Sequence, residues 1–233
     1  MKLFTDLIKS PVGAALSGMV LAQIICTTNL NDRFNDYLHS HNPFVIQEQK
    51  PEGYNLMYKN LRFTNQEMKA EAFEIADFIH ENKKHYQVIE KSTGVPWYVV
   101  GTIHMRESSG NFSTYLHNGE ELGKTTKKVP KGIFFDNWEE AAEDAIKRYY
   151  KDNQKEFGTL EALERYNGLG YRNKECEGHK VSSPYLWSGS QHYHQGKYVR
   201  DGVFACNTVD KQLGTATMIK AMQKKGYIQE PKL

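Results

Sequence analysis

The stretch from Pro96 to Glu107 constrains the fold more than any other part of the chain. Its residues, PWYVVGTIHMRE, are apolar on nearly every side of a helix, and such a helix has to lie near the centre of a folded domain. Glu107 ends the stretch, and the small residues from Ser108 to Gly110 follow as a turn. We expect the carboxyl group to lose much of its water there, which raises its pKa because desolvation disfavours the charged form. A carboxyl group that stays protonated near neutral pH can act as a general acid; a glutamate that ends a helix in open solvent is the alternative.

The composition indicates a soluble globular protein with room for one well-packed domain and a small appendage. The chain has 233 residues, of which 39% are hydrophobic and 25% are charged. A net charge of +2 is too small to indicate a nucleic-acid partner. Neither a glycine-rich phosphate loop nor a nucleophile elbow occurs in the sequence. Aromatic residues gather in the second half beside Gly, Ser, Asn and His, a mixture that suits either carbohydrate binding or a core of hydrogen-bonded tyrosines.

The first 26 residues carry a targeting signature. From Val12 to Cys26 the chain has 15 uncharged residues, fewer than the roughly 20 that a membrane-spanning helix needs. That length fits the apolar region of a signal peptide or a weak anchor. We therefore predict that residues 1–26 are a targeting or anchor segment and that residues 12–26 associate with the inner membrane; a soluble helix packed on the domain is the alternative. Such a segment predicts export of the chain or its attachment to a membrane.

Breaker residues divide the rest of the chain into an arm and a domain. Residues 27–63 are polar and contain Pro43, Pro51 and Gly53, which predicts a linker or a loosely attached arm. Residues 64–233 are predicted to form one mainly helical domain, in which apolar residues recur at helical spacing and capping residues mark the helix ends. The helices predicted in this way are 64–92 with Thr64 as N-cap, 96–107, 137–150 with Asn137 as N-cap, 159–167, and 208–225.

Two long segments of the domain lack a helical period. We expect residues 110–136 to form a loop, with room for a short hairpin, beside the site. Residues 171–206 are expected to form a long, aromatic-rich irregular loop. Irregular segments of that length in a compact domain are frequently functional. Both follow Glu107 in the chain, so they are candidates for the walls of a substrate site.

The cysteines and histidines leave two questions open. Of the three cysteines, Cys176 and Cys206 could pair outside the cytoplasm, or they could be separate buried thiols. A zinc site would need a second matched pair of ligands, which the spacing does not provide, so we expect neither a metal nor another cofactor. The residues considered for zinc are Cys176, His179, His192 and His194.

The run from Trp97 to Phe112 resembles the catalytic Glu-Ser region of the lysozyme-like superfamily, which includes goose-type lysozymes, soluble lytic transglycosylases and many phage endolysins. In that superfamily a helix-ending glutamate followed by serine is the general acid, which implies this role for Glu107. The motif Leu116–Gly119 follows in the expected order and leads to Glu120. The resemblance covers about residues 64–226 and implies a mainly α, lysozyme-like α+β fold.

Two further motifs extend the resemblance. The segment Glu164–Gly168 resembles the Tyr-Asn-Ala-Gly motif that lines the sugar cleft of transglycosylases, and Ser183–Tyr193 with Gly196–Gly202 is similar to a phage and bacterial branch of wall hydrolases. The Gly-Leu-Met-Gln type motif that often follows the catalytic glutamate is absent, and Gly123–Gly132 stands in its place. The resemblance implies substrate contacts from Ser108, His117, Asn118, Tyr166, Asn167, Tyr185, Trp187 and Tyr193. The alternative role for Asn167 is a helix C-cap. The alternative roles for the aromatic residues are core packing and anchoring of the loop.

The position of a second carboxylate decides the type of reaction. An inverting hydrolase needs a base about 6.5–9.5 Å from the acid, with room for water, whereas a lytic transglycosylase needs none because the substrate's own hydroxyl attacks. Glu120 lies 13 positions beyond Glu107 (120 − 107), next to a glycine, and Glu121 and Asp136 are its rivals. We predict hydrolysis with Glu120 as the base, although the Tyr-Asn-Gly match favours transglycosylation.

These observations predict a monomeric peptidoglycan hydrolase of the lysozyme or endolysin kind. Its partners would be the glycan strands, and its reaction the cleavage of the β-1,4 bond between N-acetylmuramic acid and N-acetylglucosamine. Its predicted place of action is the periplasm or the cell-wall face, reached by export or by phage-mediated delivery. A lytic transglycosylase, a non-catalytic wall-binding or virion structural protein, and a chitinase-like hydrolase are the alternatives.

Overall fold

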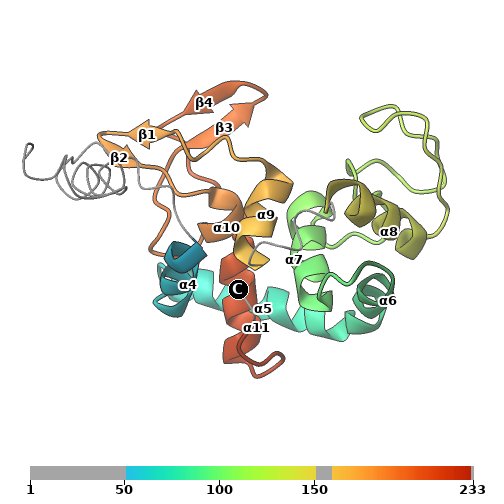
Figure 1. Cartoon of the computed structure of the whole chain (residues 1–233), viewed down its shortest axis with the longest axis horizontal. Coiled ribbons are helices and arrows are strands. Elements are labelled where there is room, and N and C mark those ends of the chain that lie inside the picture. Colours follow the sequence, from blue (N-terminus) through green and yellow to red (C-terminus); the bar gives the residue numbers. More distant parts are fainter. Residues whose placement is uncertain (1–50, 151–158, 232–233) are drawn as a thin grey trace, which may run out of the picture. The chain divides into compact units, whose positions relative to one another are not determined.

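The computed structural model describes residues 51–150 and 159–231, which belong to a compact unit from Gln49 to Leu233 (Figure 1). The predicted targeting segment, residues 1–26, lies outside the described residues, as does most of the predicted arm. Within the described residues, no helix is long and apolar enough to cross a bilayer.

The described part of the chain is mostly helical, which confirms the coarse fold class. Four short strands form two separate antiparallel hairpins, β1 with β2 and β3 with β4. The helices are α4 (Pro51–Lys59), α5 (Gln66–Glu81), α6 (Lys83–Thr93), α7 (Trp97–Ser108), α8 (Trp138–Tyr149), α9 (Thr159–Asn167), α10 (Pro184–Trp187) and α11 (Thr215–Lys224). The strands are β1 (Glu175–Cys176), β2 (His179–Lys180), β3 (Lys197–Arg200) and β4 (Val203–Ala205).

Helix α7 is the central helix, as its apolar sequence predicts. It packs against α5, α6 and α11, and its residues from Val99 to His104 are buried (Figure 1). Gly101 allows the close packing, because a Cβ there would collide with the side chain of Ile79. Burial lowers the pKa of His104 to about 4, so its imidazole is neutral at pH 7. The helix ends where Ser109 adopts a left-handed conformation, with a φ of 53°.

The predicted helix 64–92 is two helices, α5 and α6, and its N-cap is one residue later than expected. Asn65 caps α5, because its side chain accepts a hydrogen bond from the backbone N–H of Met68 at 2.8 Å. The chain bends at Asn82, whose side chain donates to the carbonyl of Phe78 at 2.9 Å and so competes with the backbone ladder. The bend allows α6 to pack against both α7 and α8.

The end of the predicted arm is part of the folded unit. Helix α4 lies within the range predicted as a linker, and its residues Tyr54 and Tyr58 are buried in the core. The hydroxyl of Tyr54 donates to Glu164 on α9, and Arg172 donates to the same carboxylate at 2.7 Å. The compact unit therefore starts before residue 64, contrary to the predicted boundary.

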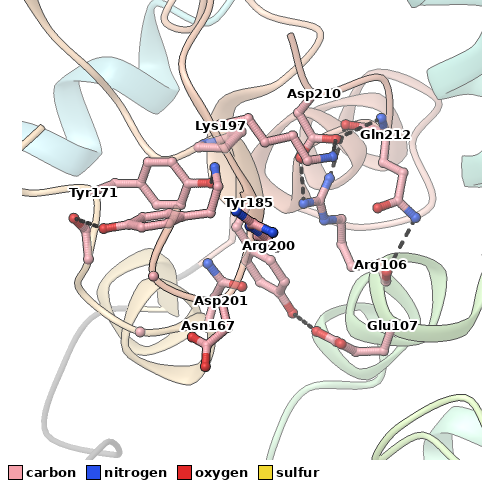
Figure 2. Close-up of a pocket in the computed structure, with 15 residues that line it drawn as sticks. Arg106, Glu107, Asn167, Tyr171, Tyr185, Lys197, Arg200, Asp201, Asp210 and Gln212 are labelled. Atoms are coloured by element: carbon pink, nitrogen blue, oxygen red, sulfur yellow. Dashed lines mark hydrogen bonds and ion pairs between the residues drawn. The ribbon is translucent and has the colours of Figure 1, made fainter. Parts of the chain in front are cut away.

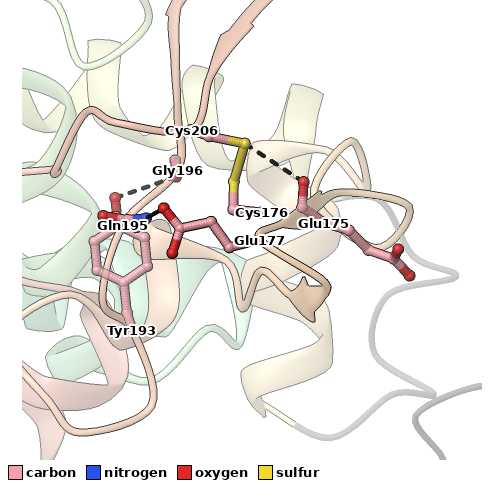
Figure 3. The surroundings of a disulfide bond; sticks show 7 residues. All are labelled: Glu175, Cys176, Glu177, Tyr193, Gln195, Gly196 and Cys206. Carbon is pink, nitrogen blue, oxygen red and sulfur yellow. Dashed lines mark hydrogen bonds between the residues drawn. A yellow bond between two sulfur atoms is a disulfide. The ribbon is translucent and has the colours of Figure 1, made fainter.

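The segment 171–206, predicted as an irregular loop, contains both hairpins, the one-turn helix α10 and a disulfide between Cys176 and Cys206 (Figure 3). The disulfide settles the question that the cysteine spacing left open. Helix α11 begins at Thr215 rather than near residue 208. Gly214, which directly precedes the helix, is extended and contacts the backbone of Leu186 so closely that no side chain would fit there.

Candidate active site

The described residues form a cleft of about 660 Å³ beside the end of α7 (Figure 2). Its walls come from residues far apart in the sequence. The contributing segments are Arg106 and Glu107 of α7, the chain between α9 and Tyr171, the start of α10, the β3–β4 hairpin, and the segment before α11. The cleft therefore exists only when the second half of the chain packs against α7.

Glu107 lies in the last turn of α7 with its carboxyl group in the cleft. The side chain keeps contact with solvent through the open side of the cleft, while protein surrounds its other sides. This crowding removes water and raises the pKa of Glu107. The hydrogen bond from Tyr185 and the charge of Arg106 act in the opposite direction without reversing the shift. The prediction that Glu107 has a raised pKa is confirmed, although the side chain is more exposed than expected.

Tyr185 fixes the orientation of the Glu107 carboxyl group. Its hydroxyl donates a hydrogen bond to Glu107 Oε1 at 3.1 Å. Pro184 starts the short helix α10, and this helix buries the ring of Tyr185 in the wall of the cleft. The guanidinium of Arg106 lies 5.0 Å from the centre of that ring, a cation–π contact. Because one oxygen of Glu107 is held by Tyr185, the other remains available to carry a proton.

A buried ion-pair network joins the helix of Glu107 to the β3–β4 hairpin. Asp210 accepts a hydrogen bond from Arg106 at 2.9 Å and another from Lys197, on β3, at 3.0 Å. Burial by itself would raise the pKa of Asp210, but its two cationic partners outweigh burial and lower it. Asp210 is therefore ionised and paired at neutral pH, and it links the two walls of the cleft (Figure 2).

The structure separates the predicted sugar-binding aromatic residues into two groups. Tyr166 is half-buried with its ring centre 6.4 Å from that of Tyr185, and Asn167 lines the cleft. Trp187 and Tyr193 are only 1% and 5% exposed and belong to the hydrophobic core. Neither presents a ring face to a sugar. Their alternative role, anchoring the loop, fits the hydrogen bond that the Tyr193 hydroxyl donates to the carbonyl of Gly196.

Ser108, His117 and Asn118 do not line the cleft. The hydroxyl of Ser108 donates to the carbonyl of His104 at 3.3 Å. The ring of His117 is buried, and its Nε2 is 2.9 Å from a carboxylate oxygen of Asp144. Asn118 donates to Glu120 at 3.0 Å. The contacts of His117 and Asn118 hold the loop that follows α7.

Glu120 also holds this loop. Its carboxylate accepts hydrogen bonds from the backbone N–H groups of Lys127 and Lys128 at 2.9–3.2 Å, in addition to the bond from Asn118. The N–H of Lys128 is the largest cause of a lowered pKa at Glu120. The Glu120 side chain does not line the cleft, although the neighbouring Gly119 lies near the backbone carbonyl of Glu107.

Three polar residues of the β3–β4 hairpin line the cleft without having been predicted from the sequence: Lys197, Arg200 and Asp201. The signal that could have found them is Gly202, which has a φ of 70° and stands between two short strand-like runs. A glycine in that setting predicts a hairpin turn. No sequence pattern indicated that this turn would line the same cleft as Glu107.

Two of the four candidate zinc ligands have other partners in the structure. Cys176 is in the disulfide, and Nε2 of His192 is 2.8 Å from the carbonyl of Met57. Across the described residues, no group of three or more His, Cys, Asp or Glu side chains could hold a metal ion.

Residues that are distant in the sequence converge around Glu107. Glu107, Asn167 and Tyr185 come from three separate motifs and line one cleft. No protein-family model matches the chain, and no curated protein or solved structure matches it either.

Proposed function

We propose that this protein is a glycosidase that cleaves the β-1,4 bond between N-acetylmuramic acid and N-acetylglucosamine in peptidoglycan, with Glu107 as the general acid. The observation that carries the proposal is the setting of Glu107: a carboxyl group with a raised pKa, at the end of a buried helix, in a cleft, with one oxygen held by Tyr185. A protonated carboxyl group with fixed orientation is what a glycosidic leaving group needs.

The chemistry assigns separate roles to the two oxygens of Glu107. The oxygen that Tyr185 does not hold carries the proton and gives it to the glycosidic oxygen as the bond to C1 breaks. The hydroxyl of Tyr185 then stabilises the carboxylate that remains, because hydrogen bonds to a charged acceptor are stronger than those to a neutral one. Asn167 at the cleft wall supplies an amide that can bind the N-acetyl group of a sugar.

Several features make peptidoglycan a more suitable substrate than chitin. The cleft is open, as a polymeric substrate requires, and its lining includes the exposed cation Arg200. Muramyl residues carry lactyl groups and peptides with carboxylates, whereas chitin is uncharged. The ordered motifs from Trp97 to Gly202 resemble wall hydrolases, and a mainly helical unit with a glutamate at the end of a central helix is compatible with a lysozyme-like fold.

A lytic transglycosylase is the second candidate, and a specific observation favours it. Glu120, the predicted base, has its carboxylate occupied by the backbone of its own loop. If no other carboxylate activates water, the substrate's own hydroxyl attacks and anhydro-muramic ends result. A non-catalytic wall-binding protein would have no use for a glutamate with a raised pKa.

Substitution of Glu107 by Gln tests the proposal. The amide keeps the shape of the side chain but has no proton to donate, so lysis of purified cell walls should fall by about 10²–10⁴-fold. Glu121→Gln is the matched control, since Glu121 is exposed, pairs with Lys124 and lies outside the cleft. Lysis by Glu107→Gln within tenfold of the unmodified protein would remove Glu107 from the reaction. Equal cleavage of soluble chitin oligomers would favour the chitinase-like alternative.

A further inference from the structure

We infer that Asp201, at the turn of the β3–β4 hairpin, is the second catalytic carboxylate and activates water for hydrolysis. The inference rests on the proposed function, because a glycan has to lie in the cleft beside Glu107. It gives the role of base to a residue from the second half of the chain, in place of Glu120.

The carboxylates that line the cleft identify Asp201 by elimination. Among the described residues they are Glu107, Asp201 and Asp210. Asp210 is buried, and its two cationic partners lower its pKa, so it is a weaker base than an unpaired carboxylate. Asp201 is exposed and forms no hydrogen bond or ion pair with any other described residue. A base needs this combination of access and an unoccupied carboxylate.

The hairpin that carries Asp201 is held in place relative to Glu107. Lys197 on β3 pairs with Asp210, which pairs with Arg106, the residue directly before Glu107. The hydroxyl of Tyr171 accepts a hydrogen bond from the backbone N–H of Tyr198 at 3.2 Å. These contacts attach the first strand of the hairpin to the wall of the cleft that contains Glu107.

The pairing register of the hairpin changes just before Asp201. The pairing shifts between Tyr198 and Arg200, so that Tyr198 pairs with Phe204 but Arg200 pairs with Val203. Such a bulge increases the local twist and redirects the side chains that follow it. In Figure 2, Arg200 and Asp201 lie with Glu107 and Tyr185 around the same cleft.

The reaction that this arrangement supports is a single displacement. Glu107 gives its proton to the glycosidic oxygen while the bond between that oxygen and C1 breaks. The water oxygen forms the new bond to C1 with a lone pair, and Asp201 takes one proton from that water. Exchange of one proton through solvent restores both carboxyl groups. Attack from the opposite face of the sugar inverts C1, so a β-linked strand yields an α-anomer first.

The test compares Asp201→Asn with the matched control Asp136→Asn, an exposed aspartate outside the cleft, both in the full chain. Purified peptidoglycan is digested in H₂¹⁸O, and the products are analysed by mass spectrometry and by NMR of the anomeric proton. The unmodified protein and the control should give reducing muramic ends that carry ¹⁸O and are initially α. Asp201→Asn should be slower by at least about 100-fold with an unchanged circular dichroism spectrum. Azide, an anion that needs no base, should restore its turnover and give a glycosyl azide.

Four results would overturn the inference. Anhydro-muramic ends from the unmodified protein, or retention of configuration, would remove the need for this base while leaving Glu107 in place. Turnover of Asp201→Asn within tenfold of the unmodified protein would exclude a catalytic role. Loss of activity in Glu120→Gln with Asp201→Asn fully active would assign the base to Glu120. Full activity of Glu107→Gln would overturn both this inference and the proposed function.

Discussion

The hydroxyl of Tyr185 has two effects on Glu107 that can be separated by measurement. It orients the carboxyl group, and it lowers the pKa of Glu107 against the upward effect of burial. A general acid works while it is protonated, so activity should fall as the pH rises through the pKa of Glu107. The alkaline side of the pH–rate profile therefore reports on this single contact.

Tyr185→Phe should move the alkaline limb of the kcat/KM profile to higher pH. Removing the hydrogen bond takes away an interaction that favours the charged form, so the pKa of Glu107 rises further and the acid stays protonated over a wider range. The maximum rate should fall about tenfold, because the carboxylate left after proton transfer loses a charge-assisted hydrogen bond. An alkaline limb that stays in place or moves to lower pH would contradict this role.

Asp210→Asn should destabilise the protein by about 3–5 kcal/mol at pH 7, because Arg106 would remain buried without its anionic partner. The effect should depend on pH. The folded-state pKa of Asp210 lies below its ordinary value of 3.8, so its stabilising contribution is complete above that value and is lost as the pH falls through the lowered pKa. Calorimetry at pH 7 and in acid should show the two proteins converging in acid. A constant difference in melting temperature would contradict the assignment.

At the scale of elements, local sequence patterns predicted the helices better than the hairpins. Helix α7 follows from its apolar run, and α8 follows from Asn137, whose side chain accepts from the N–H of Glu140 as a cap should. The bend at Asn82 leaves the apolar spacing of the helices intact, so periodicity did not predict it. The two hairpins have strands of two to four residues, too short for an alternating pattern to be recognised.

The candidate site was predictable only where its residues belong to short motifs. Glu107 and Tyr185 could be named because the residues around each form a pattern. Asp210, Lys197 and Asp201 could not, because their roles depend on packing between distant parts of the chain. Trp187 and Tyr193 were assigned to the cleft because their segment resembles wall hydrolases, yet an aromatic side chain in a loop of this size serves equally as the loop's own core.

Glu120→Gln should loosen the loop after α7. The amide cannot accept the backbone hydrogen bonds of Lys127 and Lys128 as strongly as the carboxylate does. Hydrogen exchange followed by mass spectrometry should therefore show faster exchange at these two amides, with little change in melting temperature. Unchanged exchange together with slowed turnover would instead return Glu120 to the role of base.

At the scale of the whole molecule, the disulfide joins the two hairpins. It connects Cys176 on β1 to Cys206, which directly follows β4 (Figure 3). A Cβ on Gly196, the residue before β3, would lie 3.1 Å from the sulfur of Cys176, so both ends of the cleft hairpin meet at the disulfide. Loss of the bond should affect the cleft more than the helices.

Replacing both Cys176 and Cys206 with Ser should lower stability by about 2–4 kcal/mol, through loss of the constraint on the unfolded chain. The helical circular dichroism signal at 20 °C should remain, while lysis of cell walls should drop because the hairpin that carries Asp201 loses its tie to β1. Treatment of the unmodified protein with a reductant should reproduce the drop. Full lytic activity in the double variant would contradict a role of the disulfide in shaping the cleft.

The disulfide also makes the constraint on the cleft hairpin depend on the redox state of its surroundings. Thiols stay reduced in a cytoplasm buffered by glutathione, and disulfides form in the periplasm and outside the cell. A chain folded under reducing conditions would therefore hold its cleft hairpin without the covalent tie, and would acquire the tie on transfer to an oxidising compartment.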